Sequence, residues 1–240
     1  MSDKFLMPEL VPDQKKMAGD FKKILLIAGG RTPHISWIRR AAADRIIYCA
    51  DHGLDICIKA GLKPDFILGD GDSADTANWQ WAKSAGVPFM SFPSDKDLTD
   101  TQLALQKITE RCICADIILT GVWGGRFDHL FSSLFSLSGL SNKNVRLCAA
   151  DDKETLFYLK DGHMSFRCGQ RPLSISLLPF SNVCRGVSIN GTKWPLDKVT
   201  LLQKMPYAVS NILQGTEECT VQVEKGILGI YFCWHDFGKI

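Results

Sequence analysis

Apolar segments alternate with helix-like segments through the first 150 residues, and this alternation limits the folds open to the chain. Continuous apolar runs with the length of buried strands stand at 24–28, 45–50, 66–68, 87–92, 114–120 and 145–149. The segments between them are predicted as helices at about 33–43, 54–60, 75–85, 98–110 and 127–140. Strands that alternate with helices form βαβ units, and the resulting parallel sheet is covered on both faces. We therefore predict an α/β fold that begins with a Rossmann-like three-layer domain built on a mostly parallel sheet.

The pattern changes after Asp151 and Asp152. Short runs of strand character, punctuated by glycines, stand at 154–159, 163–167, 173–179, 183–189, 199–202, 220–223 and 227–233. They predict a C-terminal all-β domain, a sandwich or barrel-like unit, over residues 152–240. The α/β domain then covers residues 23–151. Residues 1–22 are expected to be a weakly ordered lead-in, because Pro8 and Pro12 oppose regular structure.

Charge and cysteine content exclude several classes of protein. The formal net charge is only +2, which argues against a nucleic-acid partner or an anionic membrane surface. The nine cysteines are odd in number and include no Cys-x-x-Cys pair, so neither a disulfide framework nor a zinc site is expected. No signal peptide and no apolar run long enough to span a membrane is seen. We expect a cytoplasmic protein.

The segment Gly69–Ser73 is the first candidate for chemistry. Asp70 and Asp72 follow a short apolar strand and are separated by one glycine. Two carboxylates so close repel each other unless a cation lies between them, and hard oxygen ligands suit Mg²⁺, especially Mg²⁺ that also carries substrate phosphates. The alternative is a solvated turn in which Ser73 caps the following helix.

Other polar residues follow the remaining strands of the predicted sheet. They are Gly29, Gly30 and Arg31 after the first strand, Asp51 after the second, Asp95, Asp97 and Asp100 after the fourth, and Gly124, Gly125, Arg126, Asp128 and His129 after the fifth. In an open parallel sheet, ligands bind at the edge formed by the carboxyl ends of the strands. We therefore expect a metal site beside a phosphate-binding cradle at this edge.

Each of these signals is weak by itself. Asp97 is equally suited to cap a helix, with Asp100 three residues on. Arg126 is equally suited to pair with Asp128 on the surface, and His129 is equally suited to lie in the core. Gly29-Gly30 lacks the third glycine of a dinucleotide motif, and no Walker loop is present. The acidic run also fails as an EF-hand, because Asp75 and Trp81 stand where that loop needs Gly and Glu. Their common placement favours phosphoryl or pyrophosphoryl transfer.

Several motifs, spread from Ile24 to Tyr231, resemble those of the thiamine pyrophosphokinase family. In the first half they are Ala50-Asp51-x-Gly53, Gly69-Asp70-Gly71-Asp72-Ser73, Asp95-Lys96-Asp97-Leu98-Thr99-Asp100 and Gly124-Gly125-Arg126-Phe127-Asp128-His129. In the second half they are Ser176-Leu177-Leu178-Pro179, Gly191-Thr192-Lys193-Trp194-Pro195-Leu196 and Val209-Ser210-Asn211. The order of the motifs fits the predicted α/β-then-β layout.

The resemblance implies transfer of the terminal diphosphate of ATP to the hydroxyl of thiamine, with release of AMP. It implies Mg²⁺ held by Asp70, Asp72 and Asp97 or Asp100, which are also the candidate catalytic residues. The nucleotide and its phosphates are expected at Gly29, Gly30, Arg31, Asp51, Ser73, Gly124, Gly125, Arg126, Asp128 and His129. Thiamine is expected at Asp51, Trp194, Ser210 and Asn211. A homodimer with active sites at the subunit interface is also implied.

Three positions depart from the family pattern. His52 stands in place of a glycine, Asp55 in place of an asparagine, and Gly71 in place of the aromatic residue between the two acids. Gly71 is expected to loosen the loop or reshape the site. None of the three changes removes a carboxylate, so activity is expected to survive.

Two alternative functions remain open at this point. One is a pyrophosphokinase of the same fold that acts on another alcohol, such as a hydroxymethylpterin. The other is a non-catalytic protein that senses thiamine diphosphate or a nucleotide. The motifs at Trp194 and Ser210-Asn211 disfavour the first, and the full set of acids disfavours the second.

Overall fold

The computed structural model describes residues 5–11, 21–92, 97–140, 142 and 144–238. It divides into two compact units. Of the described residues, 5, 21–92, 97–137 and 144–151 belong to the α/β unit, and 6–11, 138–140, 142 and 152–238 belong to the β unit. Within the described residues, no helix combines the length and apolar character needed to cross a membrane.

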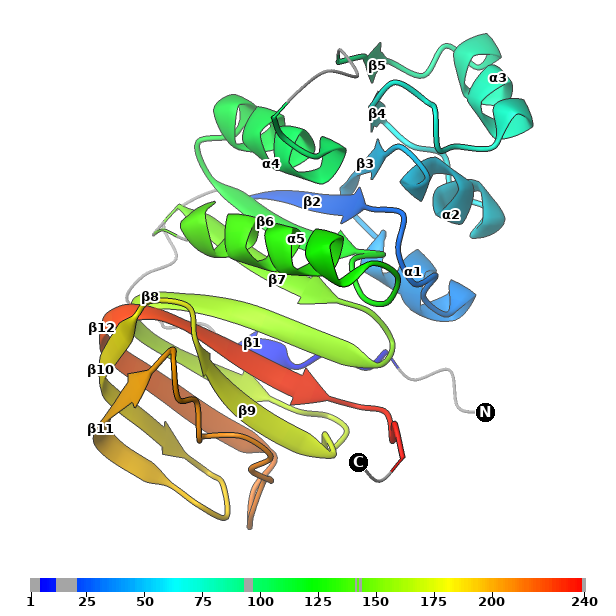
Figure 1. Cartoon of the computed structure of the whole chain (residues 1–240). Helices are drawn as coiled ribbons and strands as arrows, with labels where there is room; N and C mark the ends of the chain where they lie inside the picture. Colours follow the sequence, from blue (N-terminus) through cyan, green and yellow to red (C-terminus); the bar gives the residue numbers. More distant parts are fainter. Residues whose placement is uncertain (1–4, 12–20, 93–96, 141, 143, 239–240) are drawn as a thin grey trace. The chain divides into compact units, whose positions relative to one another are not determined.

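The α/β unit alternates strands and helices along the chain (Figure 1). Its elements are β2 (Lys22–Ile27), α1 (Ile35–Ala41), β3 (Ile46–Ala50), α2 (Gly53–Lys59), β4 (Phe66–Leu68), α3 (Thr76–Ser84), β5 (Phe89–Met90), α4 (Asp100–Arg111), β6 (Ala115–Thr120), α5 (Phe127–Leu140) and β7 (Val145–Ala150). The strands lie in the order β7-β6-β2-β3-β4-β5, and every neighbouring pair is parallel. The predicted parallel sheet is therefore confirmed.

Burial explains why this sheet takes continuous apolar runs. Ile24, Leu25, Leu26 and Ile27 of β2 are all fully buried, although successive side chains of a strand point to opposite faces. Both faces must therefore be covered, and Figure 1 shows helices on both, with α4 and α5 on the same one. The chain leaves β2 toward β3 and later returns to β6 on its other side, so the strand order reverses at β2. The carboxyl edge at such a reversal is where α/β sheets bind ligands.

The β unit is organised around its last and longest strand. Its elements are β1 (Glu9–Val11), β8 (Glu154–Arg167), β9 (Ser174–Pro179), β10 (Val183–Asn190), β11 (Leu196–Leu202) and β12 (Glu218–Cys233). β12 pairs with β8 along one side, and along the other with β10 and then β9. All pairs in this unit are antiparallel, as expected for an all-β region.

Two predicted strand breaks are wrong. Gly162 and Gly226 lie inside β8 and β12, where the sequence pattern predicted gaps between separate strands. The pairing of these two strands shifts register between Val223 and Ile227, and the N–H of Gly226 donates to the Asp161 carboxylate at 2.8 Å. The two glycines therefore lie at an irregularity within one continuous ladder and do not end the strands. Glycine inside a strand commonly marks such an irregularity.

Two further expectations about strands need correction. The lead-in is not wholly irregular, because Glu9–Val11 forms β1 and pairs with residues 165–167 of β8. Pro8 lies just before the strand, where its missing N–H costs the ladder nothing. The fourth strand of the parallel sheet is also much shorter than residues 87–92, since only Phe89 and Met90 pair with β4.

Candidate active site

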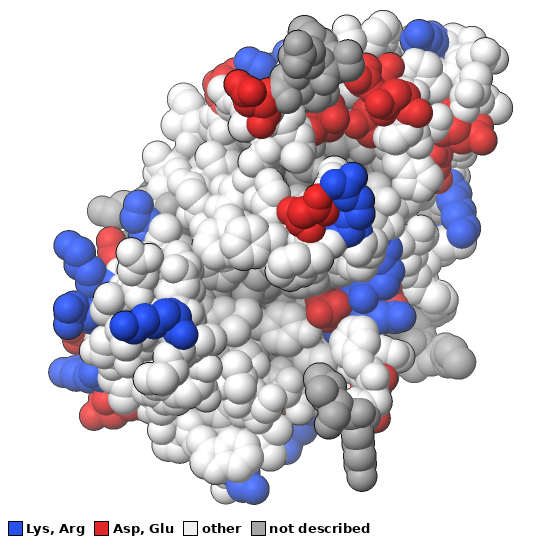
Figure 2. Space-filling model, viewed as in Figure 1, with Lys and Arg blue, Asp and Glu red and all other residues white. Residues whose placement is uncertain are grey.

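Three carboxylates meet at the carboxyl edge of the parallel sheet. Asp51 directly follows β3, and Asp70 and Asp72 follow the neighbouring strand β4. One oxygen of each lies within 4.8 Å of the others. Acidic side chains gather over the part of the surface that carries β4, β5 and α3 (Figure 2). We refer to Asp51, Asp70 and Asp72 as the acid cluster.

Backbone geometry brings the acid cluster together. The N–H of Asp51 continues the β-ladder by donating to the carbonyl of Leu68 at 3.0 Å, which sets the end of β3 beside the end of β4. Asp51 itself has a positive φ of 42°. Gly69 passes so close that a Cβ there would lie 1.7 Å from Oδ1 of Asp51, and its φ of +135° also demands glycine. The N–H of Asp72 then donates to Oδ1 of Asp70 at 3.2 Å, which closes a tight turn.

The electrostatics of Asp51 favour a cation at this point. Burial, together with the hydrogen bond and charge of Asp100 and the charge of Asp70, raises the pKa of Asp51 from 3.8 to about 7, although the N–H of Gly71 opposes this shift. Oδ1 of Asp51 is buried and has no hydrogen-bond partner within the described residues. A buried carboxylate oxygen without a donor, beside two further carboxylates, fits a hard divalent cation such as Mg²⁺.

The acids near α4 take different positions from one another. Asp100 is the first residue of α4 and reaches Asp51 through the side-chain hydrogen bond that raises the pKa of Asp51. Asp97 lies exposed before the helix, and Asp95 lies outside the described residues. The proposed helix cap at Asp97 is wrong, because Thr99 caps α4 in a reciprocal capping box with Gln102.

Ser73 is exposed in the turn after the acid cluster. The alternative interpretation expected Ser73 to cap α3, and this expectation is wrong. The cap is Asp75, whose carboxylate accepts from the N–H groups of Ala77 and Asn78. A residue two positions later takes this role because the turn through Ser73 extends the chain before the helix begins.

The two glycine-rich loops lie against each other where the strand order reverses. The N–H of Gly30 donates to the carbonyl of Gly121 at 2.5 Å, and the N–H of Arg31 donates to the carbonyl of Trp123 at 2.6 Å. A Cβ at Gly30 would stand 2.5 Å from that Gly121 oxygen, so only glycine allows this approach. Gly29 meets the side chain of His52 in a similar way, with a Cβ contact of 2.8 Å. The first loop is therefore held by the second.

The arginines of these loops have different surroundings. Nε and Nη2 of Arg31 lie 2.8 and 2.7 Å from Oδ2 of Asp151, whose side chain is fully buried. Arg126 instead pairs with Asp128 at the surface, where the two side chains remain 73% and 62% exposed. The hydrogen bond from Arg126 lowers the pKa of Asp128 to about 2. Arg126 thus forms the surface pair considered as an alternative, without losing access to solvent.

His129 and the glycines beside it lie on the same exposed loop and helix start. The core position considered for His129 is wrong, because this residue is exposed, as are Gly124 and Gly125. Both glycines have a φ near +70°. The N–H of His129 donates to the carboxylate of Asp128 at 3.0 Å. The imidazole therefore faces solvent at the start of α5.

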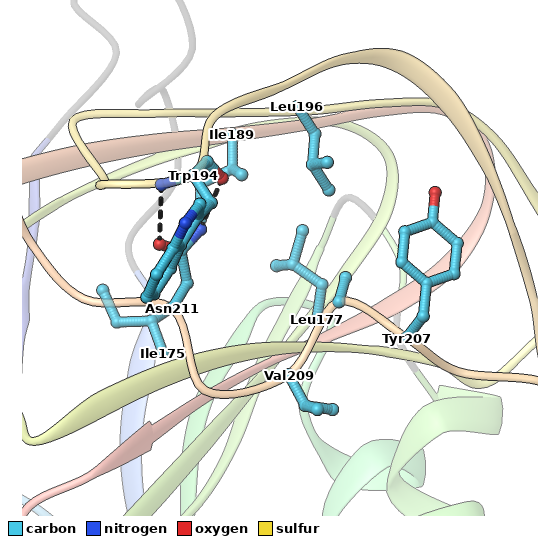
Figure 3. A pocket seen from close by; sticks show the side chains of 9 residues that line it. Ile175, Leu177, Ile189, Trp194, Leu196, Tyr207, Val209 and Asn211 are labelled. Atoms are coloured by element: carbon cyan, nitrogen blue, oxygen red, sulfur yellow. Dashed lines mark hydrogen bonds between the residues drawn. The ribbon is translucent and has the colours of Figure 1, made fainter.

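The β unit contains a hollow of about 200 Å³ with a largely apolar lining. The residues that line it are Ile175, Leu177, Ile189, Trp194, Leu196, Tyr207, Ala208, Val209 and Asn211. In Figure 3 the rings of Trp194 and Tyr207 flank this hollow from two sides. Both rings are about half exposed, at 54% each, so they offer aromatic surface to a ligand. The ammonium group of Lys193 lies 4.8 Å from the ring centroid of Trp194.

Asn211 fixes the backbone of Trp194. Its Oδ1 accepts from the N–H groups of Trp194 and Ile212 at 3.1 and 2.9 Å, and its Nδ2 donates to the carbonyl of Trp194 at 2.6 Å and to the Thr192 hydroxyl at 3.1 Å (Figure 3). All four hydrogen-bonding positions of the amide are used within the unit. The preceding Ser210 is exposed, has a φ of 61°, and donates its N–H to the Ser176 hydroxyl.

Sequence patterns did not reveal three residues of these sites. Asp151 directly follows β7, where the sequence marks only a change of pattern. Tyr207 lies in a segment without a motif, and Trp79 of α3 lies outside any polar cluster of the sequence. Asp151 alone carried a usable signal, because an acid directly after an apolar strand falls on the same carboxyl edge as the acid cluster.

Comparisons with known proteins match both units. A family model for the thiamin pyrophosphokinase catalytic domain matches residues 39–149. A second model, for the vitamin B1 binding domain of thiamin pyrophosphokinase, matches residues 170–228. The two models follow each other in the order of the two units. The chain belongs to the thiamine pyrophosphokinase family. Its activity is that of a kinase-type transferase.

Individual thiamine pyrophosphokinases support this assignment. The chain is 26% identical over 209 residues to thiamine pyrophosphokinase of Bacillus subtilis, which covers 86% of this chain and 96% of the relative. The crystal structure of thiamine pyrophosphokinase from Bacillus subtilis aligns with a TM-score of 0.79 at 24% identity, covering 89% of this chain and all of that one. Thiamin pyrophosphokinase from Candida albicans aligns with a TM-score of 0.75 at 17% identity, covering 96% of this chain and all of that one. The fold of the family is thus retained at low identity.

Proposed function

We propose that this chain transfers the diphosphate of ATP to the hydroxyl of thiamine and forms thiamine diphosphate and AMP. One observation carries the proposal. The acid cluster of Asp51, Asp70 and Asp72 lies at the carboxyl edge of the parallel sheet, inside the region that matches the catalytic family model. The B1-binding family model covers the unit that contains the apolar hollow, which supports thiamine as the second substrate.

The acid cluster has the ligand type, the charge and the unpartnered oxygen that Mg²⁺ requires. Asp70 and Asp72 are the proposed ligands, with Asp51 beside them. Asp100 joins this set through its hydrogen bond to Asp51, and Asp97 remains a proposed outer member. Mg²⁺, when bound, neutralises the phosphate charge and orients the phosphates.

The side chains of this chain supply the remaining steps. The hydroxyl oxygen of thiamine attacks the β-phosphorus of ATP, and the bond from that phosphorus to the oxygen bridging to the α-phosphate breaks, so that AMP leaves. Asp72 or Asp100 accepts the hydroxyl proton. Arg126 steadies the phosphates, because its exposed guanidinium can exchange Asp128 for a phosphate group. Arg31, held by Asp151, contributes a fixed positive charge beside the glycine loops Gly29-Gly30 and Gly124-Gly125.

Thiamine is a flat, cationic heteroaromatic molecule, and the hollow of the β unit matches that chemistry. Trp194 and Tyr207 present aromatic faces, which attract a cationic ring. Asn211 serves thiamine indirectly by fixing Trp194, and Ser210 offers an exposed hydroxyl next to it. Asp51 is a further proposed contact of thiamine, and Ser73 belongs to the proposed contacts of the nucleotide.

Direct assay with a matched pair of variants tests the proposal. Pure protein with ATP, Mg²⁺ and thiamine is expected to release one AMP for each thiamine diphosphate formed. Asp70→Asn and Asp72→Asn are expected to lower turnover by about 100-fold or more, because each removes charge from the acid cluster. Asp44→Asn is the control, since Asp44 precedes the amino end of β3, the strand whose carboxyl end bears Asp51.

The products distinguish the alternatives. ADP in place of AMP contradicts diphosphate transfer. Faster turnover of a hydroxymethylpterin than of thiamine points to another pyrophosphokinase. Binding of ATP and thiamine by the wild-type protein without any turnover points to a sensor.

Four further features belong to the same proposal. We propose that the α/β unit is a Rossmann-like three-layer domain for ATP and Mg²⁺, and that the β unit is a sandwich that binds thiamine. We propose a homodimer with active sites at the subunit interface, as the family resemblance implies. A cytoplasmic location is also proposed, and it is supported by nine cysteines that are all free.

A further inference from the structure

Gly71 separates two members of the acid cluster and lies under an aromatic ring from a different element. Its φ is +80°, and a Cβ built on it would stand 2.5 Å from Cε2 and 2.7 Å from Cζ2 of Trp79. Trp79 belongs to α3, eight positions further along the chain. The indole therefore occupies the space that a side chain at position 71 would need.

The ring of Trp79 has firm neighbours beyond Gly71. The centroid of the Phe89 ring lies 6.4 Å away at a tilted angle, and the ammonium group of Lys83 lies 5.8 Å from the Trp79 centroid. Phe89 belongs to β5, the edge strand that pairs with β4. The indole thus packs between Gly71 and an aromatic side chain of the sheet, and it is half-buried.

The first turn of α3, which carries Trp79, is anchored to α2. The carboxylate of Asp55 accepts from the N–H of Asp75 at 3.0 Å and from the side-chain amide of Asn78 at 2.7 Å. It also pairs with His52 at 2.8 Å. Because α2 begins two residues after Asp51, these contacts fix Trp79 relative to the third member of the acid cluster.

The turn between Asp70 and Asp72 needs such a support, because its own residues do not hold it in one conformation. Two carboxylates one residue apart repel each other, and the glycine between them has more conformational freedom than any other residue. Packing of the indole over Gly71 excludes the conformations in which the turn lifts away from the sheet. The indole therefore restricts the directions in which the carboxylates of Asp70 and Asp72 can point.

We propose that Trp79 is a positioning residue for the acid cluster: its indole closes over Gly71 and holds the turn so that Asp70 and Asp72 face Asp51. This role rests on the proposed function, in which these acids bind Mg²⁺. The same helix provides a control, because Trp81 lies two positions further on, is 43% exposed, and contacts no other aromatic ring within the described residues.

Metal binding without ATP or thiamine tests the proposal. Titration of the protein with Mg²⁺, followed by calorimetry, is expected to show about tenfold weaker binding for Trp79→Ala, the size of effect seen when a group that orients metal ligands is lost. Trp79→Phe is expected to recover most of the affinity, and Trp81→Ala is expected to bind as the wild type does. Because the indole of Trp79 lies over the turn that bears Asp70 and Asp72, Mg²⁺ is expected to change the tryptophan fluorescence of the wild-type protein. This change is expected to vanish in Trp79→Phe and persist in Trp81→Phe.

Gly71 supplies a second, independent variant. Gly71→Ala is expected to weaken Mg²⁺ binding, both by displacing the indole and by straining the turn at a φ of +80°. The double variant Gly71→Ala with Trp79→Ala is expected to bind no more weakly than the worse single variant. Unchanged Mg²⁺ affinity in Trp79→Ala, or an equal loss in Trp81→Ala, overturns the proposal. If Trp79→Ala does not fold, Trp79→Leu takes its place in the same titration, with weaker Mg²⁺ binding expected and an unchanged affinity overturning the proposal.

Failure of this inference and failure of the proposed function leave different results. Wild-type protein that binds Mg²⁺ at the acid cluster more tightly than Trp79→Ala does, yet makes no thiamine diphosphate, contradicts only the function. If the wild-type protein makes thiamine diphosphate and Trp79→Ala binds Mg²⁺ as tightly as the wild type does, only the inference is contradicted.

Discussion

Arg31 and Asp151, 120 positions apart in the sequence, form an ion pair in which Nε and Nη2 of the arginine both reach the same carboxylate oxygen, at 2.8 and 2.7 Å. The side chain of Asp151 is fully buried, whereas that of Arg31 is 23% exposed. The pair therefore joins the end of β7 to the glycine loop that follows β2.

Asp151→Asn tests this pair. The variant removes the fully buried charge of the pair and leaves the guanidinium of Arg31, 23% exposed, without its counter-charge. Removing one member of such a pair costs about 3 kcal/mol, so the free energy of unfolding is expected to fall by roughly that amount. Urea denaturation followed by circular dichroism measures it. Arg126→Ala is the control, because its ion pair is exposed and solvent screens it, and its unfolding curve is expected to match the wild type. Equal stability of Asp151→Asn and wild type would contradict the assigned role of the pair.

Gly69→Ala is expected to abolish activity. Its Cβ would lie 1.7 Å from Oδ1 of Asp51, so the acid cluster has to move apart. We expect turnover to fall by about 100-fold or more and Mg²⁺ binding to weaken with it. Gly86→Ala is the matched control, since Gly86 also has a positive φ, +67°, but open space around its Cβ position. It is expected to lose only about 1 kcal/mol of stability, with activity retained.

The titration of Asp51 predicts a pH dependence for the metal-free protein. Its pKa is raised from 3.8 to about 7, so the folded state holds this proton more tightly than the unfolded state does. The resulting stabilisation is complete below the unfolded value and is lost as the pH rises through about 7. The melting temperature in chelator is therefore expected to fall between pH 5.5 and 8, and Asp51→Asn is expected to flatten this slope.

Mg²⁺ binding is expected to show the opposite trend, because the metal requires the ionised carboxylate of Asp51. Below its pKa of about 7, release of one proton on binding weakens the apparent affinity by about tenfold for each pH unit. Calorimetric titrations from pH 5.5 to 8 measure this dependence. An affinity independent of pH across that range would show that Asp51 binds the metal without losing a proton.

Asn211→Asp is expected to raise KM for thiamine more than it lowers kcat. The change removes the Nδ2 donors to the Trp194 carbonyl and the Thr192 hydroxyl and places a charge in a buried position. Loss of such buried hydrogen bonds costs about 1–3 kcal/mol, which corresponds to roughly a 5- to 150-fold weaker thiamine interaction. Steady-state kinetics with thiamine varied at saturating ATP measure the effect.

Asn190→Asp supplies the comparison for that variant. Asn190 is exposed at the end of β10 in the same unit, so its kinetics are expected to equal those of the wild type. If Asn211→Asp lowers kcat while KM stays constant, Asn211 acts on the chemical step and not through Trp194.

The sequence predicted the α/β unit well because burial leaves a direct trace in composition. A strand covered on both faces, such as β2, must be apolar at every position, and the helices between strands follow from the need to cross the sheet. The placement of Asp51 and Asp70 at one edge follows from strand direction alone. In the β unit the sequence pattern wrongly predicted strand ends at Gly162 and Gly226. A glycine that ends a strand and a glycine at an irregular pairing look identical in sequence when the partner strand is unknown.

Sequence by itself thus determined the order of the elements, the strand ends that bear acids, and the family motifs from Ala50 to Asn211. Only the tertiary structure decided which acids meet: Asp51 joins Asp70 and Asp72 because its backbone turns at a positive φ beside Gly69. It also decided that Asp151 holds Arg31 and that Trp79 lies over Gly71. These contacts join segments whose separation along the chain carries no pattern, so they follow from packing in three dimensions and not from local sequence.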